Sequence, residues 1–294
     1  MRVDRKRLPS SSLLLLPSPL LPSSRVPLLD LQLTDKHILI TGGASGIGLA
    51  TAREFLREQA RVTILDRGEA PAELVREVEA QRVHYLRVDI TDFEAVQQAE
   101  EQAVAQFGPV DGVIHCAAIG SGKFGFPFTN LSPSDWGLTL QVDIMGMVHV
   151  AHALAPRMRE RKSGSLVFLS SVAGQIGSQT DPPYSAAKAA NINFAQCMAK
   201  DLAPHNVRVN TVCPGMVQTP LNRAVWQAWH DQQPPEARLK YEDWAAAKIR
   251  SIVPLGRWQT PEDIASMIVF LTSDRASNVT GQTINVDGGF VMHW

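Results

Sequence analysis

The stretch TGGASGIG, residues 41–48, decides the fold of this chain. It follows a short apolar run, residues 37–40, and it opens a helix-like stretch, residues 47–59. Glycines allow the tight turn between the two and let backbone N–H groups approach a pyrophosphate at the N-terminus of the helix. The next apolar run ends at Asp66, whose carboxylate can accept both ribose hydroxyls of NAD and would repel the 2′-phosphate of NADP. We therefore predict a dinucleotide site that prefers NAD, and Arg67 is the one neighbour that leaves NADP open.

Short apolar runs alternate with helix-like stretches along the rest of the chain. Continuous apolar strands that alternate with helices are typical of a parallel sheet covered on both faces, with right-handed crossovers. The pattern therefore predicts an α/β protein with a Rossmann-type doubly wound parallel sheet of about seven strands in a single domain. The expected strands are residues 37–40, 61–65, 83–88, 113–115, 166–169, 207–212 and 283–286, and the expected helices are residues 47–59, 71–80, 92–107, 134–161, 184–202 and 261–271.

The composition is that of an ordinary globular protein. Of the 294 residues, 45% are hydrophobic and 19% are charged, and 28 basic and 29 acidic side chains leave a net charge of −1. Because there is no bulk positive field, we expect neither nucleic acid nor a membrane as a partner. The three cysteines have no partner at metal-ligand spacing, so we expect no metal site and a reducing compartment. No run of about 18 apolar residues is present to span a bilayer.

The first 33 residues differ from the rest of the chain. They hold eleven Leu, six Ser and five Pro, with five basic residues. We interpret residues 1–33 as an unstructured extension, or as the product of a start codon placed too far upstream, and residues 34–294 as the catalytic domain. The expected location is the cytoplasm. A basic start followed by leucines leaves a transit peptide, and hence an organelle, as the alternative.

A second constellation is the pair Tyr184 and Lys188, which lie four residues apart and so share one face of a helix. A phenol, with a pKa of about 10, is a poor base at neutral pH. A cation about 6 Å away, at an effective dielectric constant of about 20, would lower that pKa by about two units. Ser171, thirteen positions upstream of the tyrosine, follows a strand, and ligands gather at the carboxyl ends of parallel strands. These three side chains predict acid/base chemistry at a hydroxyl or carbonyl group.

These motifs resemble the short-chain dehydrogenase/reductase family over essentially all of residues 34–289. TGGASGIG is similar to its TGxxxGIG cofactor motif, and YSAAK, residues 184–188, to its YxxxK motif. The resemblance implies a nicotinamide cofactor and a homotetramer or homodimer. By resemblance, the catalytic residues are Ser171, Tyr184, Lys188 and Asp143. The cofactor-binding residues implied in the same way are Gly42, Ser45, Gly46, Ile47, Gly48, Asp66, Asp89, Ile90, Ala117, Tyr184, Lys188, Pro214, Gly215, Val217 and Thr219.

Two positions depart from the family pattern. The family's NNAG segment is HCAA here, residues 115–118, and the small residue Ala117 should still allow backbone contact with a ribose. The family's catalytic Asn aligns with Asp143. An Asp can accept the same hydrogen bond, but it adds a negative charge near Lys188, which should keep the ammonium charged and partly cancel its field at Tyr184. The alternative is that Asp143 only conserves the geometry and that the relay works unchanged.

Residues 219–255 form a polar, aromatic-rich insertion at the place where a lid over the substrate would lie. For any single tryptophan, packing against the domain or an oligomer partner is favoured over a contact with the substrate. Together with Lys123, Gln175 and Gln179, the insertion favours a polyol, a sugar or a similar hydroxylated substrate. The prediction is an NAD-dependent oxidoreductase that interconverts a secondary alcohol and a ketone. The alternatives are an NADP-dependent carbonyl reductase and an NAD-binding sensor weakened by Asp143.

Overall fold

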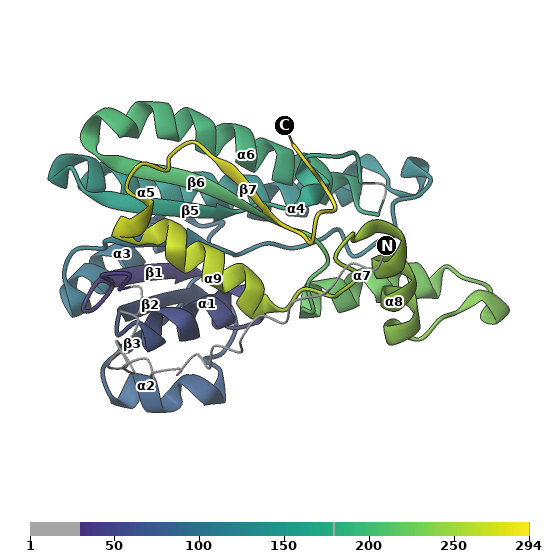
Figure 1. The fold of residues 1–294 in the computed structure, drawn as a ribbon, viewed down its shortest axis with the longest axis horizontal. Helices are drawn as coiled ribbons and strands as arrows, with labels where there is room; N and C mark the ends of the chain where they lie inside the picture. Colours follow the sequence, from purple (N-terminus) through teal and green to yellow (C-terminus); the bar gives the residue numbers. More distant parts are fainter. Residues whose placement is uncertain (1–29, 179, 294) are drawn as a thin grey trace, which may run out of the picture. The chain divides into compact units, whose positions relative to one another are not determined.

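Seven parallel strands form one sheet in the order β3-β2-β1-β4-β5-β6-β7 (Figure 1). The computed structural model describes residues 30–178 and 180–293. The chain order reverses between β1 and β4, and in doubly wound sheets ligands bind outside the carboxyl ends of the strands at this point. The predicted fold and its seven strands are confirmed. The strands are β1 (His37–Thr41), β2 (Arg61–Asp66), β3 (Val83–Arg87), β4 (Gly112–His115), β5 (Gly164–Leu169), β6 (Val207–Pro214) and β7 (Thr283–Val286).

Helices cover both faces of this sheet, which explains why the inner strands are apolar on both sides. One face packs against α1 and α9, which lie side by side, and the other packs against α3, α5 and α6. Strand β1 is buried at all five positions. The helices are α1 (Gly46–Arg57), α2 (Val75–Glu79), α3 (Phe93–Phe107), α4 (Gly137–Leu140), α5 (Gly146–Arg161), α6 (Pro182–Leu202), α7 (Pro220–Asp231), α8 (Tyr241–Ile252) and α9 (Pro261–Thr272).

The folded part of the chain begins earlier than the sequence pattern indicates. Leu33 is 4% exposed and belongs to the core cluster under α1 and α9, and Leu31 packs against the same cluster. The backbone N–H of Lys36 donates to the carbonyl of Leu33. Two residues that we assigned to the extension therefore belong to the domain. The rest of the expected extension, residues 1–29, lies outside the described residues.

The long helix expected over residues 134–161 is interrupted. It runs as a short 3₁₀ turn, then α4, then a π-helical turn over Gln141–Met145, and then α5. A π turn inserts one residue into the helical repeat and is frequently found at functional sites. Here it contains Asp143, which is fully buried. Periodicity alone does not reveal such a turn, because the flanking residues continue the helix on both sides.

By length and composition, the segment Pro133–Arg161 is the one candidate for a membrane-spanning helix within residues 30–178 and 180–293. In the structure its side chains Met147, Val150 and Leu154 lie in the core cluster between the sheet, α3 and α6. The helices at the core of soluble proteins meet the same criterion.

The insertion between β6 and α9 contains two helices, α7 and α8, that the sequence analysis does not assign. Its aromatic residues pack mainly against one another. Trp244 and Tyr241 are 4% and 8% exposed and stack with ring centroids 6.3 Å apart. The Tyr241 hydroxyl donates to the Asn222 side chain at 3.0 Å, and the Trp226 indole N–H donates to the Leu239 carbonyl. These aromatic side chains build a small apolar cluster of their own that holds the two helices together.

Candidate active site

The glycine-rich turn joins β1 to α1 at the switch point of the sheet. Gly42 and Gly46 have φ values of +70° and +54°, which favour glycine. A Cβ at Gly48 would overlap the carbonyl oxygen of Gly42, and a Cβ at Gly42 would lie 2.6 Å from the amide nitrogen of Ala117. Ser45 is the N-cap of α1, but its side chain makes no capping hydrogen bond. The turn therefore packs tightly while leaving the first amides of α1 available to an anion.

Two carboxylates lie near the glycine-rich turn, at or just after the carboxyl ends of the neighbouring strands β2 and β3. Asp66, at the end of β2, accepts hydrogen bonds at 2.9 Å from the amides of Ala44 and Gly68, one on each oxygen. It therefore ties the glycine-rich turn to the next strand, and each oxygen keeps a lone pair for a ribose hydroxyl. Asp89 accepts from the amide and the hydroxyl of Thr91, which lower the pKa of its carboxyl.

The segment after β6 is bridged to Gln259 at Val217. The amide of Gln259 donates to the Met216 carbonyl at 3.2 Å, and the amide of Gln218 donates to the Gln259 carbonyl at 3.1 Å. In this parallel bridge Val217 faces Gln259, and its own N–H and C=O point to the opposite side. The methyl group of Thr219 lies 3.5 Å from the position of a Cβ at Gly46, so this segment reaches the glycine-rich turn. The Thr219 hydroxyl also accepts the Asn222 amide as the N-cap of α7.

Tyr184, Lys188 and Asp143 form a compact cluster. The Lys188 ammonium lies 5.3 Å from the centroid of the Tyr184 ring and 3.4 Å from Asp143 Oδ2. Both charged side chains are almost completely buried. Asp143 Oδ1 accepts the amide of Ile119 at 2.8 Å, and the ammonium donates to the Leu169 carbonyl at 3.1 Å.

Ser171 lies two residues after the end of β5 and begins a short 3₁₀ turn. Its hydroxyl oxygen accepts the amide of Ala173 at 3.1 Å, and the Ser171 side chain lowers the pKa of the Tyr184 phenol. The structure thus brings together at the carboxyl ends of the strands the four side chains that the sequence analysis predicts to be catalytic.

Burial raises the pKa of the Tyr184 phenol above its ordinary value. The charge of Lys188 lowers that pKa, and the charge of Asp143 raises it. The lowering that we expected from the lysine is present, but the cost of burying a phenolate is larger. Burial also opposes the charge on Lys188, yet Asp143 and Tyr184 raise the pKa of the ammonium above its usual range, and it stays charged. Burial raises the pKa of the Asp143 carboxyl, and Lys188 acts in the opposite direction.

The HCAA segment places a histidine and a cysteine at the end of β4, close enough to Lys188 for its charge to act on both. Burial lowers the pKa of His115 to about 3, and burial raises the pKa of the Cys116 thiol to about 12, so both side chains are neutral at physiological pH. His115 Nδ1 lies 2.9 Å from the Thr41 hydroxyl, which also accepts the Ala117 amide. The segment therefore fixes Ala117 beside the glycine-rich turn without adding charge.

Other residues of the expected pocket have different surroundings. The Lys123 ammonium pairs with both oxygens of Asp135, at 2.8 and 2.9 Å, so its charge is already neutralised. The Gln175 amide donates to Asn285 Oδ1 at 2.7 Å and lies on the loop between Ser171 and α6. Gln179 lies outside the described residues.

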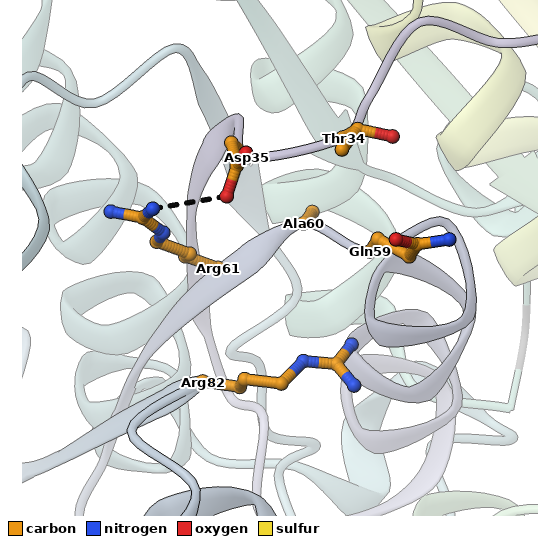
Figure 2. Close-up of a pocket in the computed structure, with 6 residues that line it drawn as sticks. All are labelled: Thr34, Asp35, Gln59, Ala60, Arg61 and Arg82. Atoms are coloured by element: carbon orange, nitrogen blue, oxygen red, sulfur yellow. Dashed lines mark hydrogen bonds and ion pairs between the residues drawn. The ribbon is translucent and has the colours of Figure 1, made fainter.

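A separate surface pocket lies at the N-terminal ends of the strands, on the side of the sheet opposite to the catalytic cluster (Figure 2). The Arg61 guanidinium pairs with Asp35 at 3.0 Å, and that of Arg82 hydrogen-bonds to the Leu56 carbonyl and pairs with Glu77. Because both cations already have partners and the catalytic cluster lies at the other edge, we assign no chemistry to this pocket.

Sequence reasoning does not find several groups that hold the cluster in place. These groups include the Leu169 carbonyl, the Ile119 amide and the Ser170 hydroxyl, which donates to the Lys188 carbonyl at 2.7 Å. Backbone groups carry no signal in a sequence. Asp181 could have been found, because an Asp before Pro182 is a typical helix start, and it does cap α6.

Comparison with known proteins agrees with this geometry. Residues 42–291 match the family model described as enoyl-(acyl carrier protein) reductase. The chain is 34% identical to a 3-oxoacyl-(acyl-carrier-protein) reductase of Thermotoga maritima, with 89% of this chain and 100% of the relative covered. It is also 34% identical to the L-xylulose reductase of Bos taurus, with 90% and 99% covered. The aldohexose dehydrogenase structure of Thermoplasma acidophilum superposes with a TM-score of 0.76 at 27% identity, over 88% of this chain and 94% of that one.

Fold and site together define an oxidoreductase architecture with a place for a nicotinamide cofactor. The chain belongs to the short-chain dehydrogenase/reductase family. The similar proteins named above are dehydrogenases and reductases, so the family resemblance seen in the motifs is confirmed.

Proposed function

We propose that this protein is an NAD-dependent oxidoreductase that interconverts a secondary alcohol and a ketone. The observation that carries the proposal is the buried cluster of Tyr184, Lys188 and Asp143, which lies with Ser171 at the end of the sheet that holds the glycine-rich turn. A phenol held beside an ammonium is suited to exchanging a proton with a hydroxyl group.

The chain offers a fitting cradle for the cofactor. A side chain at Gly42 or Gly48 would fill the space of the turn, and the Ser45 hydroxyl makes no capping hydrogen bond. The backbone N–H and C=O of Val217 point away from Gln259, the residue to which Val217 is bridged. The turn would hold the pyrophosphate, Asp66 the adenosine ribose, and residues 214–219 the nicotinamide amide. When bound, the oxidised nicotinamide accepts a hydride and brings a positive charge into the site.

Each residue of the cluster then has a defined task. Tyr184 removes the proton of the substrate hydroxyl during oxidation and returns it during reduction. The Ser171 hydroxyl, whose oxygen is already an acceptor, donates to the substrate oxygen and fixes its position. Lys188 stabilises the phenolate, and Asp143 keeps the lysine charged while weakening its effect on the phenol.

A polar substrate, such as a polyol or a sugar, is our proposal for the compound that is oxidised. It is supported by Gln175 beside the Ser171 turn and by relatives whose names include galactose dehydrogenase and L-xylulose reductase. The aromatic residues of the lid contribute less to this argument than expected from the sequence, since Tyr241 and Trp244 pack inside the lid.

An NADP-dependent carbonyl reductase is the second candidate, and Arg67 is the observation that favours it. This side chain is exposed and directly follows Asp66, where it could pair with a 2′-phosphate. Against this, Asp66 presents its negative charge at the same edge and is fixed by two backbone amides.

The test is the reduction of NAD and of NADP by a panel of polyols, sugars and secondary alcohols, followed by the absorbance of the reduced nicotinamide. We expect turnover with at least one of these compounds and a higher kcat/KM for NAD. A strong preference for NADP would favour the second candidate. Nucleotide binding without turnover for the whole panel, with activity restored in Asp143→Asn, would favour the sensor.

We further propose that the protein is cytoplasmic and acts as a homotetramer or homodimer, with neither nucleic acid nor a membrane as a partner. The oligomer is supported by the exposed apolar side chains of Leu138 and Met145 on the helix that contains Asp143, at 65% and 39% exposure. Sedimentation velocity of the purified chain measures this, and a monomer at micromolar concentration contradicts it.

A further inference from the structure

Asp181 is a buried carboxylate three residues before the tyrosine. It caps α6 and is only 6% exposed. One of its oxygens accepts the Tyr184 amide at 3.4 Å, and the other accepts the amide of Ser121 at 2.8 Å. An ordinary N-cap bonds only within its own helix and faces solvent, whereas this one reaches a distant segment of the chain.

That distant segment is the post-β4 loop, residues 116–125. It is fastened at a second point to the residues just before α6, because the Gly125 amide donates to the Thr180 carbonyl at 2.9 Å. A Cβ at Gly120 would lie 2.7 Å from Asp181 Oδ2, and a Cβ at Gly125 would overlap the Pro182 ring, so only glycines allow the two segments to approach this closely.

The same loop also contacts the catalytic cluster from its other end. The Ile119 amide donates to Asp143 Oδ1, and Ala117 packs against the glycine-rich turn. The post-β4 loop is therefore held between two carboxylates, one beside Lys188 and one at the first turn of the tyrosine helix.

We propose that Asp181 is a positioning residue of the reaction: its buried carboxylate locks the post-β4 loop onto the first turn of α6, three residues before Tyr184, and so places a second negative charge near the catalytic cluster. This proposal rests on the proposed function. Asp181 touches no reacting atom and acts through the loop and through its field.

The groups that act on the phenol support this assignment. From α6 the Lys188 charge favours the phenolate, whereas Asp143 from the π turn and Asp181 from the helix start both oppose it. The remaining titratable neighbours lie at the end of β4, directly after it, and on β6, and they are His115, Cys116 and Cys213. Burial lowers the pKa of the histidine and raises the pKa values of the two thiols, so all three are neutral at assay pH. Burial raises the pKa of Asp181 itself, while its hydrogen bonds with Ser121 and Tyr184 act in the opposite direction.

The test compares Asp181→Asn and Asp181→Ala with the wild type in three measurements: the pH profile of alcohol oxidation at saturating NAD, the Kd of NADH by fluorescence, and the Tm. Asp181→Asn has nearly the same shape without the charge, and we expect its ascending limb to move to lower pH, because the charge of Asp181 raises the pKa of the Tyr184 phenol. Asp181→Ala also releases the loop, and we expect its Kd for NADH to rise on the order of tenfold, the equivalent of one charge-assisted hydrogen bond.

Asp92→Asn is the matched control, because Asp92 is also a helix N-cap but is exposed to solvent. Its pH profile should coincide with that of the wild type. The proposal is overturned if Asp181→Asn keeps the wild-type profile, or if folded Asp181→Ala binds NADH as the wild type does and only its Tm falls. If the wild type oxidises no alcohol but Asp181→Ala still weakens NADH binding, the proposed function fails while the locking of the loop stands.

Discussion

Replacing Asp143 by Asn removes one charge from the catalytic cluster and retains an acceptor for the Ile119 amide. The Lys188 ammonium, 5.3 Å from the centroid of the Tyr184 ring, favours the phenolate by about 3 kcal/mol at an effective dielectric constant of about 20. Asp143 Oδ2 lies 3.4 Å from the same ammonium. Adding this distance to the 5.3 Å between the ammonium and the ring centroid places Asp143 Oδ2 within about 9 Å of the ring. At that distance its charge opposes the phenolate by roughly 2 kcal/mol before water and relaxation weaken it.

Alcohol oxidation needs the phenolate, so its rate rises with pH until Tyr184 is deprotonated. Because Asp143 raises the pKa of this phenol, its removal should move the ascending limb to lower pH, by up to about one unit. The assay measures initial rates of NAD reduction against pH, at saturating NAD and alcohol, for the wild type and Asp143→Asn. An unchanged limb refutes the reasoning and indicates that Asp143 is protonated at assay pH, and a limb that moves to higher pH refutes it as well.

Further results are expected from other variants. Tyr184→Phe should lower kcat by about 10²- to 10⁴-fold while the Kd of NADH, measured by fluorescence, changes little; activity near the wild type would show that another group transfers the proton. Asp66→Ala should reduce the ratio of kcat/KM for NAD over NADP, and an unchanged ratio would remove Asp66 from cofactor selection. His115, with a pKa of about 3 in the folded state, stays neutral while the unfolded chain takes up a proton below pH 6.5, so the free energy of unfolding should fall by up to about 3 kcal/mol by pH 4.5. Denaturant titrations at neutral pH and at pH 4.5 should show a smaller fall of the free energy of unfolding in His115→Asn than in the wild type. An equal fall would contradict the low pKa of His115 in the folded state. Deleting residues 1–29 should leave folding and activity intact, whereas Leu33→Ala should cost about 2–5 kcal/mol of stability in the same denaturant assay; a neutral Leu33→Ala would place that residue outside the core.

The sequence predicts the parts of the fold that repeat a local pattern. Seven apolar runs alternate with helices, and they become seven parallel strands with the glycine-rich turn at the switch point. The four side chains expected to be catalytic carry their own chemical signal, and the structure brings them together.

What the sequence does not predict depends on contacts between distant segments. The π turn around Asp143 has the sequence periodicity of an ordinary helix. Leu33 belongs to the core, but in the sequence it cannot be told from the many leucines that precede it. The direction of the pKa shift at Tyr184 follows from burial, which spacing along a helix does not give. Asp181 becomes informative only when its second partner, the Ser121 amide, is seen on another loop.

The most direct test of the central claim follows the hydride itself. A secondary alcohol that the enzyme oxidises, carrying deuterium on its carbinol carbon, is incubated with NAD, and the reduced nucleotide is analysed by mass spectrometry. We predict that the label appears in NADH with the wild type and is lost with Tyr184→Phe, since that variant binds the nucleotide but cannot take the hydroxyl proton. Transfer of label that does not depend on Tyr184, or reduced nucleotide that carries no label, would contradict the account.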